Sequence, residues 1–270
     1  MVKKLFKHEC IYYFRTFSIF LPIVLVIAVM TRVFLLFGDD ILSAQIAFGS
    51  SATMLVIACM GLLTLPTVIG VVRFYKNMYS AEGYLTFTLP VTNTQHIFVK
   101  LVVSVVCQII CALVVVVAGV IALSGKPLNK ICEFVAWQLE QLIKAYGWFH
   151  VLAFAIELIL ALILSVASAI LLYYACISIG QTAKKNRILM AFVAYIVYYV
   201  AMQAISTAFT IVSMILAEVG GFDAIVIWSI EHPVASMHLF NWAMIIVNAG
   251  GTALFWWVTQ FIMSKKLNLE

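Results

Sequence analysis

Charged residues are scarce in this sequence. Only 10% of its 270 residues are Asp, Glu, Lys or Arg, whereas 65% are hydrophobic. This composition leaves little chain for a soluble domain and is typical of a protein embedded in a membrane. The net charge of +5 is divided among short segments between apolar runs. Because the cations form no continuous basic stripe, nucleic-acid binding is not expected.

The sequence also lacks the common motifs of nucleotide-binding and hydrolytic enzymes. Gly125 precedes Lys126, but Val120 stands where a phosphate-binding Gly-x-x-x-x-Gly-Lys loop needs its first glycine. The five histidines form no His-Glu-x-x-His pair, and no serine lies in a nucleophile-elbow pattern. We therefore expect neither enzyme activity nor a cofactor in this chain.

Cysteines give little support for a disulfide or a metal site. Of the six, only Cys132 is expected on the outer side, so no intrachain disulfide can form there. Cys107 and Cys111 share one helix face, but no His or acidic residue accompanies them at ligand spacing. Packing is the favoured role for this pair.

Six apolar runs cross the chain, and each has at least the roughly 20 residues with which a helix spans about 30 Å of hydrocarbon. They are residues 17–37, 50–72, 97–123, 151–179, 188–217 and 241–263. We predict an all-α, polytopic membrane protein in which residues 1–270 form a single transmembrane domain of six helices.

The charges between the runs alternate in sign. Of the 16 basic residues, twelve fall on the side of the amino terminus: Lys3, Lys4, Lys7, Arg15, Arg73, Lys76, Lys100, Lys184, Lys185, Arg187, Lys265 and Lys266. Most acidic residues fall on the opposite side: Asp39, Asp40, Glu133, Glu140, Glu218, Asp223 and Glu231. Lys and Arg near the ends of spans are retained in the cytosol, so both termini are predicted to be cytosolic.

Residues 1–16 combine lysines with apolar side chains at three-and-four spacing, including Phe6, Tyr13 and Phe14. This pattern predicts an amphipathic helix at the inner membrane interface, and a simple extension of the first span is the alternative.

Residues 73–96 form the longest cytosolic segment and are rich in aromatic side chains. Gly83 interrupts the segment and Pro90 ends its apolar part, while Thr92 and Gln95 have the spacing of a capping box for the third span. We predict a short projecting helix or turn whose apolar side chains need cover from a partner or from the bundle. An interfacial loop on lipid headgroups is the alternative.

Two outer segments, residues 124–150 and 218–240, are also partly apolar. An apolar stripe over residues 129–146 predicts an external helix on the membrane or on the bundle. In the second segment Pro233 and the charges argue against a seventh crossing, so a re-entrant or surface helix is predicted.

Two ionisable residues lie inside the apolar runs: Arg32 near the outer end of the first, and Glu157 about two turns into the fourth. Charges at such a depth are costly unless they are paired or hydrated, and we hypothesise an Arg32–Glu157 contact. In the alternative, Arg32 extends to the interface and Glu157 is protonated or bonded to a neighbouring helix.

The apolar runs also contain two features that affect helix packing. Pro66 predicts a kink in the second span, and small residues around Ser165 and Ser168 predict a close helix contact in the fourth.

One cytosolic motif resembles a known family. Arg73-Phe-Tyr-Lys-Asn77 is followed by Glu82-Gly-Tyr-Leu-Thr-Phe-Thr-Leu-Pro-Val91 and by the basic Lys100. This pattern is similar to that in permease subunits of bacterial ABC transporters of the type-two exporter class, and the layout of the whole chain agrees with the resemblance. The external stretch 129–146 departs from the family pattern.

The resemblance implies a partner and an energy source. In that family a coupling helix in the first cytosolic loop docks on a separate ATPase subunit, and two six-span permeases line the path. The docking element would be Glu82, Gly83, Tyr84, Leu85 and Phe87, with Arg73, Tyr75 and Lys76 shaping its approach. ATP and Mg²⁺ would bind the ATPase, and the second permease would be identical or diverged. The complex would lie among the lipids of the bacterial cytoplasmic membrane.

The expected function is therefore that of a permease subunit that moves a peptide, lipid or drug-like substrate outward. Two other functions stay open. An ion- or proton-coupled carrier would work alone, but it would need more buried carboxylates than Glu157. A non-transporting scaffold or immunity protein would bind without flux.

Overall fold

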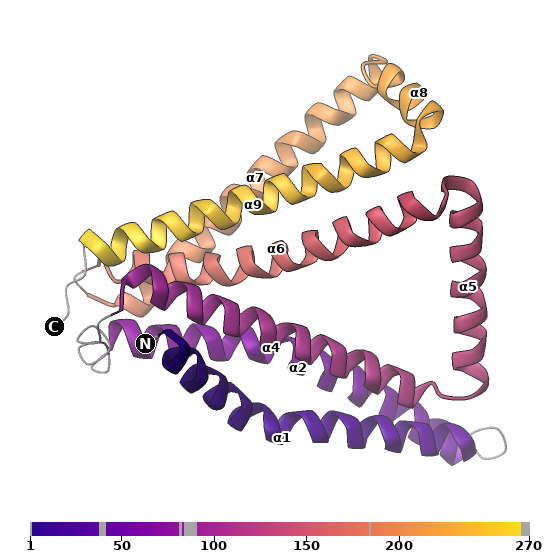
Figure 1. Ribbon diagram of the computed structural model, residues 1–270, viewed down its shortest axis with the longest axis horizontal. Coiled ribbons are helices and arrows are strands. Elements are labelled where there is room, and N and C mark those ends of the chain that lie inside the picture. The colour runs from indigo at the N-terminus through magenta and orange to yellow at the C-terminus, as the bar shows by residue number, and fades with distance from the viewer. Residues whose placement is uncertain (1, 38–41, 81–82, 84–90, 184, 266–270) are drawn as a thin grey trace. The chain divides into compact units, whose positions relative to one another are not determined.

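The computed structural model describes residues 2–37, 42–80, 83, 91–183 and 185–265. Within these ranges every regular element is an α-helix (Figure 1), which confirms the predicted all-α fold. Among the described helices, six are long and apolar enough to cross a bilayer, and the chain is a multi-pass membrane protein. Contacts divide the chain into two compact units, Met1–Gln141 and Leu142–Glu270. That the two units act as one domain stays a prediction.

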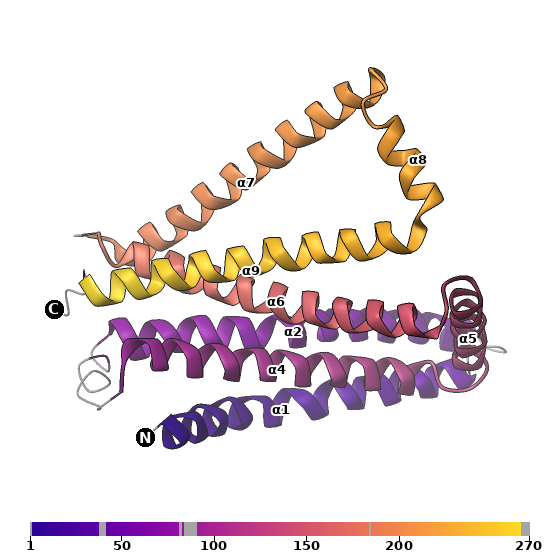
Figure 2. The ribbon, with the colours of Figure 1, turned by 45° about the horizontal axis from the view of Figure 1, so that its top comes forward.

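The first unit contains α1 (Val2–Phe37), α2 (Leu42–Tyr79), α4 (Asn93–Ala122) and most of α5 (Lys126–Tyr146). Helices α1, α2 and α4 pack against one another (Figures 1 and 2). Their buried apolar side chains form one core: Tyr13, Phe17, Val24, Ala28, Leu55, Leu62, Val99, Val103, Cys111, Ala118 and Ala122. Helix α5 covers the stretch predicted to form an external helix, and none of its residues is buried. Its location outside the membrane stays a prediction.

Residues 2–37 form one continuous helix, which is curved in Figure 1 and contains Pro22. The sequence predicts a separate interfacial helix over residues 1–16, but no break divides these residues from the first span. Tyr13 and Phe17 belong to the apolar pattern of this region, and both are buried in the core of the unit. The apolar face therefore continues the packing of the first span; its depth relative to the bilayer surface stays a prediction.

Helix α2 continues to Tyr79, so residues 73–79 of the predicted cytosolic segment extend the second span as helix. Pro66 lies inside this helix and leaves the carbonyl of Leu62 without its helical donor. At the next residue, the carbonyl of Leu63 accepts a hydrogen bond from Gln108 Nε2 of α4 at 2.8 Å. A side chain of the neighbouring helix thus binds the backbone at the proline.

The beginning of α4 has the predicted capping box. Gln95 N donates to Thr92 Oγ1 at 3.4 Å, and Thr92 N donates to Gln95 Oε1 at 3.2 Å. The two bonds satisfy backbone donors that have no partner within the helix. They fix the residue at which the chain enters α4.

The second unit contains α6 (Trp148–Gly180), α7 (Arg187–Glu218), α8 (Asp223–Glu231) and α9 (Pro233–Lys265). Helix α6 packs against both α7 and α9 (Figure 2). A Cβ added at Gly251 of α9 would lie 3.0 Å from Ser168 Oγ, so the small-residue face of α6 permits the predicted close approach. None of the residues of α7 is buried, and its exposed apolar surface suits contact with lipid or protein.

The helix of the sixth span extends beyond the predicted apolar run. The run covers residues 241–263, whereas α9 begins at Pro233. Proline is tolerated in the first helical turn because its missing N–H would have no partner within the helix. Pro233 therefore starts a helix, and α8 is the short helix predicted within residues 218–240.

Candidate functional site

A buried carboxylate joins the three long helices of the first unit. Glu9 of α1 is 2% exposed, and its Oε1 accepts a hydrogen bond from Lys100 Nζ of α4 at 2.8 Å. Arg73 Nε of α2 donates to Glu9 Oε2, and Asn77 Nδ2 lies 3.5 Å from Glu9 Oε1. We name Glu9, Arg73, Asn77 and Lys100 the anchor cluster.

Helical spacing explains how the anchor cluster forms. Arg73 and Asn77 are four residues apart and therefore lie on one face of α2, in its last two turns. Lys100 lies two turns into α4, so the cluster stands at the helix ends that bound residues 80–92. The end of α2 and the beginning of α4 are thereby both joined to α1.

Two polar contacts between α1 and α4 repeat with one register. Glu9 pairs with Lys100, and one turn further along both helices Tyr13 Oη lies 2.7 Å from Ser104 Oγ. Both pairs are separated by 91 residues, so α1 and α4 run in the same direction. Such a direction is required of the first and third spans of a six-span protein.

The electrostatics of the anchor cluster favour a rigid joint. Lys100 is only 4% exposed and Arg73 is 18% exposed, so water screens these ion pairs weakly. The Arg73 guanidinium also lies 3.8 Å from the ring centroid of Tyr12, which adds a cation–π contact to α1. Loss of one partner from a buried ion pair generally costs about 3–5 kcal/mol.

His96 adds an unusual group next to this cluster. It lies one turn before Lys100 on α4 and is 1% exposed. Neither of its ring nitrogens has a hydrogen-bond partner within the described part of the chain. A buried polar group without a partner generally costs about 1–3 kcal/mol.

The residues predicted for ATPase docking are only partly described. Arg73 belongs to the anchor cluster, Tyr75 is half-buried, and Lys76 is exposed at the end of α2. Gly83 is buried and donates its N–H to Ser80 O at 2.7 Å. Glu82, Tyr84, Leu85 and Phe87 lie outside the described residues, so their docking role stays a prediction.

A second polar group lies within the unit of residues 142–270. Glu157 of α6 is 12% exposed, and both of its carboxylate oxygens lie 2.9 Å from His238 Nδ1 of α9. Asn241 Nδ2 is 3.5 Å from Glu157 Oε2, and His150 Nδ1 is 3.4 Å from His238 Nε2. Glu157 is therefore bonded to a neighbouring helix, which was one of the alternatives for this residue.

Arg32, the other predicted intramembrane ion, is half-buried in the first unit. Its Nη2 lies 2.8 Å from the position that a Cβ at Gly125 would occupy. Gly125 has φ +94°, a conformation that side chains rarely adopt, so glycine suits this turn in two ways. The Arg32–Glu157 contact would join the two units and stays a prediction.

Sequence reasoning missed Glu9, His150 and His238 as partners of other charges. The signal for Glu9 was its position one turn before Tyr13, on a face that also contains Phe17. The signal for the histidines was the depth of Glu157, because a carboxylate inside a span needs a partner. His150 stands seven residues before Glu157, about two turns along the same helix face.

Metal binding has no support in this geometry: in residues 2–37, 42–80, 83, 91–183 and 185–265 no three His, Cys, Asp or Glu side chains could hold an ion together. In the comparisons with known proteins, no family model, curated protein or solved structure matches the chain.

Proposed function

We propose that this multi-pass membrane protein is the permease subunit of an ATP-driven exporter and that residues 80–92 receive the motion of a separate ATPase. The anchor cluster is the observation that carries this proposal. It joins α1, α2 and α4 at the two helix ends that bound residues 80–92.

A docking segment can move a transmembrane bundle only when its ends are fixed to that bundle. Arg73 holds the end of α2 to Glu9, and Lys100 holds the beginning of α4 to the same carboxylate. A displacement of the segment would therefore move three helices together, as in rigid-body switching. The aromatic motif around Tyr84 supports the same role, because apolar cytosolic side chains favour a protein partner.

If a neighbouring gene encodes an ATP-binding-cassette ATPase, coexpression with that ATPase tests the proposal. We expect the two proteins to copurify in detergent, and we expect Tyr84→Ala or Glu82→Arg to abolish the complex. Glu133→Gln, an exposed change on α5, is the control and should leave it intact. An intact complex with both docking substitutions would contradict the docking assignment.

Transport by the reconstituted complex completes the test. An exporter subunit requires ATP and both proteins, whereas a carrier that works alone requires neither ATP nor the ATPase. Flux through vesicles that contain only the purified chain would therefore favour the ion- or proton-coupled alternative. Binding without flux under every condition would favour the scaffold or immunity protein.

A further inference from the structure

The contacts of Glu157, His238 and His150 form a chain of titratable groups that the exporter function does not use. It starts at Glu157, nine residues after the first residue of α6 and thus about 14 Å along the helix. It ends at His150, which is exposed. His238 of α9 lies between them and contacts both.

We propose that Glu157 and His238 form a proton-binding site and that His150 connects this site to water at the Trp148 end of α6. The orientation of the His238 ring is the first argument. Its Nδ1 lies 2.9 Å from both oxygens of Glu157. An ionised carboxylate only accepts hydrogen bonds, so Nδ1 carries a hydrogen when Glu157 is ionised. The proton that the site binds and releases is therefore the one on Nε2, which lies next to His150.

The second argument is the balance of charge at the site. Within the described residues, His238 is the ion-pair partner of Glu157, and Asn241 and His150 complete the polar contacts. With one proton on Nε2 the pair is neutral, and without it the pair has one negative charge. An isolated charge within a span is costly, so the neutral pair suits this position.

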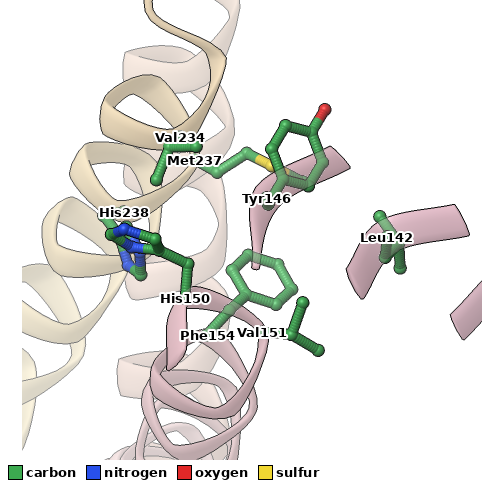
Figure 3. A pocket seen from close by; sticks show the side chains of 8 residues that line it. All are labelled: Leu142, Tyr146, His150, Val151, Phe154, Val234, Met237 and His238. Atoms are coloured by element: carbon green, nitrogen blue, oxygen red, sulfur yellow. The ribbon is translucent and has the colours of Figure 1, made fainter. Parts of the chain in front are cut away.

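The third argument is access. A pocket of about 60 Å³ has both histidine rings in its wall, together with Tyr146, Phe154 and Met237 (Figure 3). A cavity of this size has room for water, and the histidines provide polar partners for it. Water can therefore reach the two rings although most of the wall is apolar.

The proton transfer from His238 through His150 to water balances in atoms and charge. His238 Nε2 gives its proton to His150 Nδ1, and His150 releases its own Nε2 proton to water. Both imidazoles end neutral, and the water becomes hydronium. Histidine side chains in general change charge between about pH 5 and 8, so such a step can follow physiological pH.

Nitrogen NMR of ¹⁵N-histidine-labelled protein in lipid nanodiscs tests the site. The His238 signals are identified by their loss in His238→Asn. We expect Glu157→Gln to lower the proton affinity of His238 by about tenfold or more, which is a shift of about one pH unit in its titration. Glu231→Gln removes an exposed carboxylate and should leave the titration unchanged. The same titration in Glu157→Gln and native protein, or no titration between about pH 5 and 9, would overturn the site.

A second measurement does not require the single variant Glu157→Gln to fold. In His238→Gln, Glu157 loses its ion-pair partner, so we expect an infrared carbonyl band of a protonated carboxyl that is absent from native protein and from His238→Gln/Glu157→Gln. No such band at any pH between about 5 and 8 would overturn the charge balance.

His150→Asn tests the connection to water. We expect the exchange of the His238 ring protons with water to become about tenfold slower, while the titration midpoint moves by less than about one pH unit. His232→Asn, at an exposed histidine, is the matched control and should leave the exchange rate unchanged. Equal exchange rates in His150→Asn and native protein would remove His150 from the path.

Discussion

Lys100 donates a hydrogen bond to Glu9 at 2.8 Å, although these side chains are only 4% and 2% exposed. Glu9 lies on α1 and Lys100 lies on α4. Arg73 of α2 binds the other oxygen of the Glu9 carboxylate. One acidic residue thus connects three helices.

Glu9→Gln removes the negative charge and keeps the shape of the side chain. Lys100 then loses its bond to a carboxylate in a buried site, and we expect a loss of about 3–5 kcal/mol in stability. Thermal unfolding in detergent measures this as a lower Tm. Glu133→Gln, at an exposed position, should leave Tm almost unchanged.

Glu9→Gln/Lys100→Met separates the charge effect from the packing effect. Replacement of a buried ion pair by well-packed apolar groups is often close to neutral, so the second substitution should recover part of the lost stability. Equal Tm values for Glu9→Gln and native protein would show that the ion pairs do not hold the helices together.

Gly125 and Gly147 offer a matched pair of substitutions. Both have positive φ, at +94° and +83°, but a Cβ at Gly125 would meet Arg32 at 2.8 Å whereas one at Gly147 has open space. Gly147 combines φ +83° with ψ 151°, a region that almost only glycine adopts, so Gly147→Ala should cost about 1–3 kcal/mol in stability. Gly125→Ala should carry the cost of the Arg32 contact in addition to its own backbone cost. In an Arg32→Ala background the cost of Gly125→Ala should fall, whereas the cost of Gly147→Ala should stay the same. A Gly125→Ala cost that Arg32→Ala does not reduce would show that the contact is easily relieved.

The local features of this fold could be predicted from the sequence. Six spans follow from run length, and the Thr92–Gln95 capping box follows from two residues three apart. The start of α9 at Pro233 could not be predicted, because proline both ends and begins helices.

The polar sites could not be predicted, because their members are distant in sequence. Glu9 and Lys100 are 91 residues apart, and Glu157 and His238 are 81 residues apart. Hydropathy shows that a buried charge needs a partner but does not select which one. The register between α1 and α4, or between α6 and α9, makes that selection.

Cys132 gives a direct test of the topology that the charges predict. It is the only exposed cysteine of the six, all of which lie in the described residues, and it belongs to α5. A membrane-impermeant maleimide should therefore label intact cells at this residue, and Cys132→Ser should abolish the labelling. Labelling that appears only after the cells are opened would place α5 in the cytosol and reverse the predicted orientation.

His96→Leu tests whether the buried imidazole destabilises the isolated protein. The side chain is 1% exposed, and within the described residues neither nitrogen has a partner. An apolar side chain of similar size removes that unfavourable burial, so we expect stability to rise by about 1–3 kcal/mol and Tm to rise with it. Asn241→Leu is the control: it removes a buried polar group that does have a partner, Glu157, and should lower Tm. A lower Tm for His96→Leu as well would mean that His96 is satisfied in the folded protein. Its partner would then have to come from the segment between α2 and α4, from water or from another subunit.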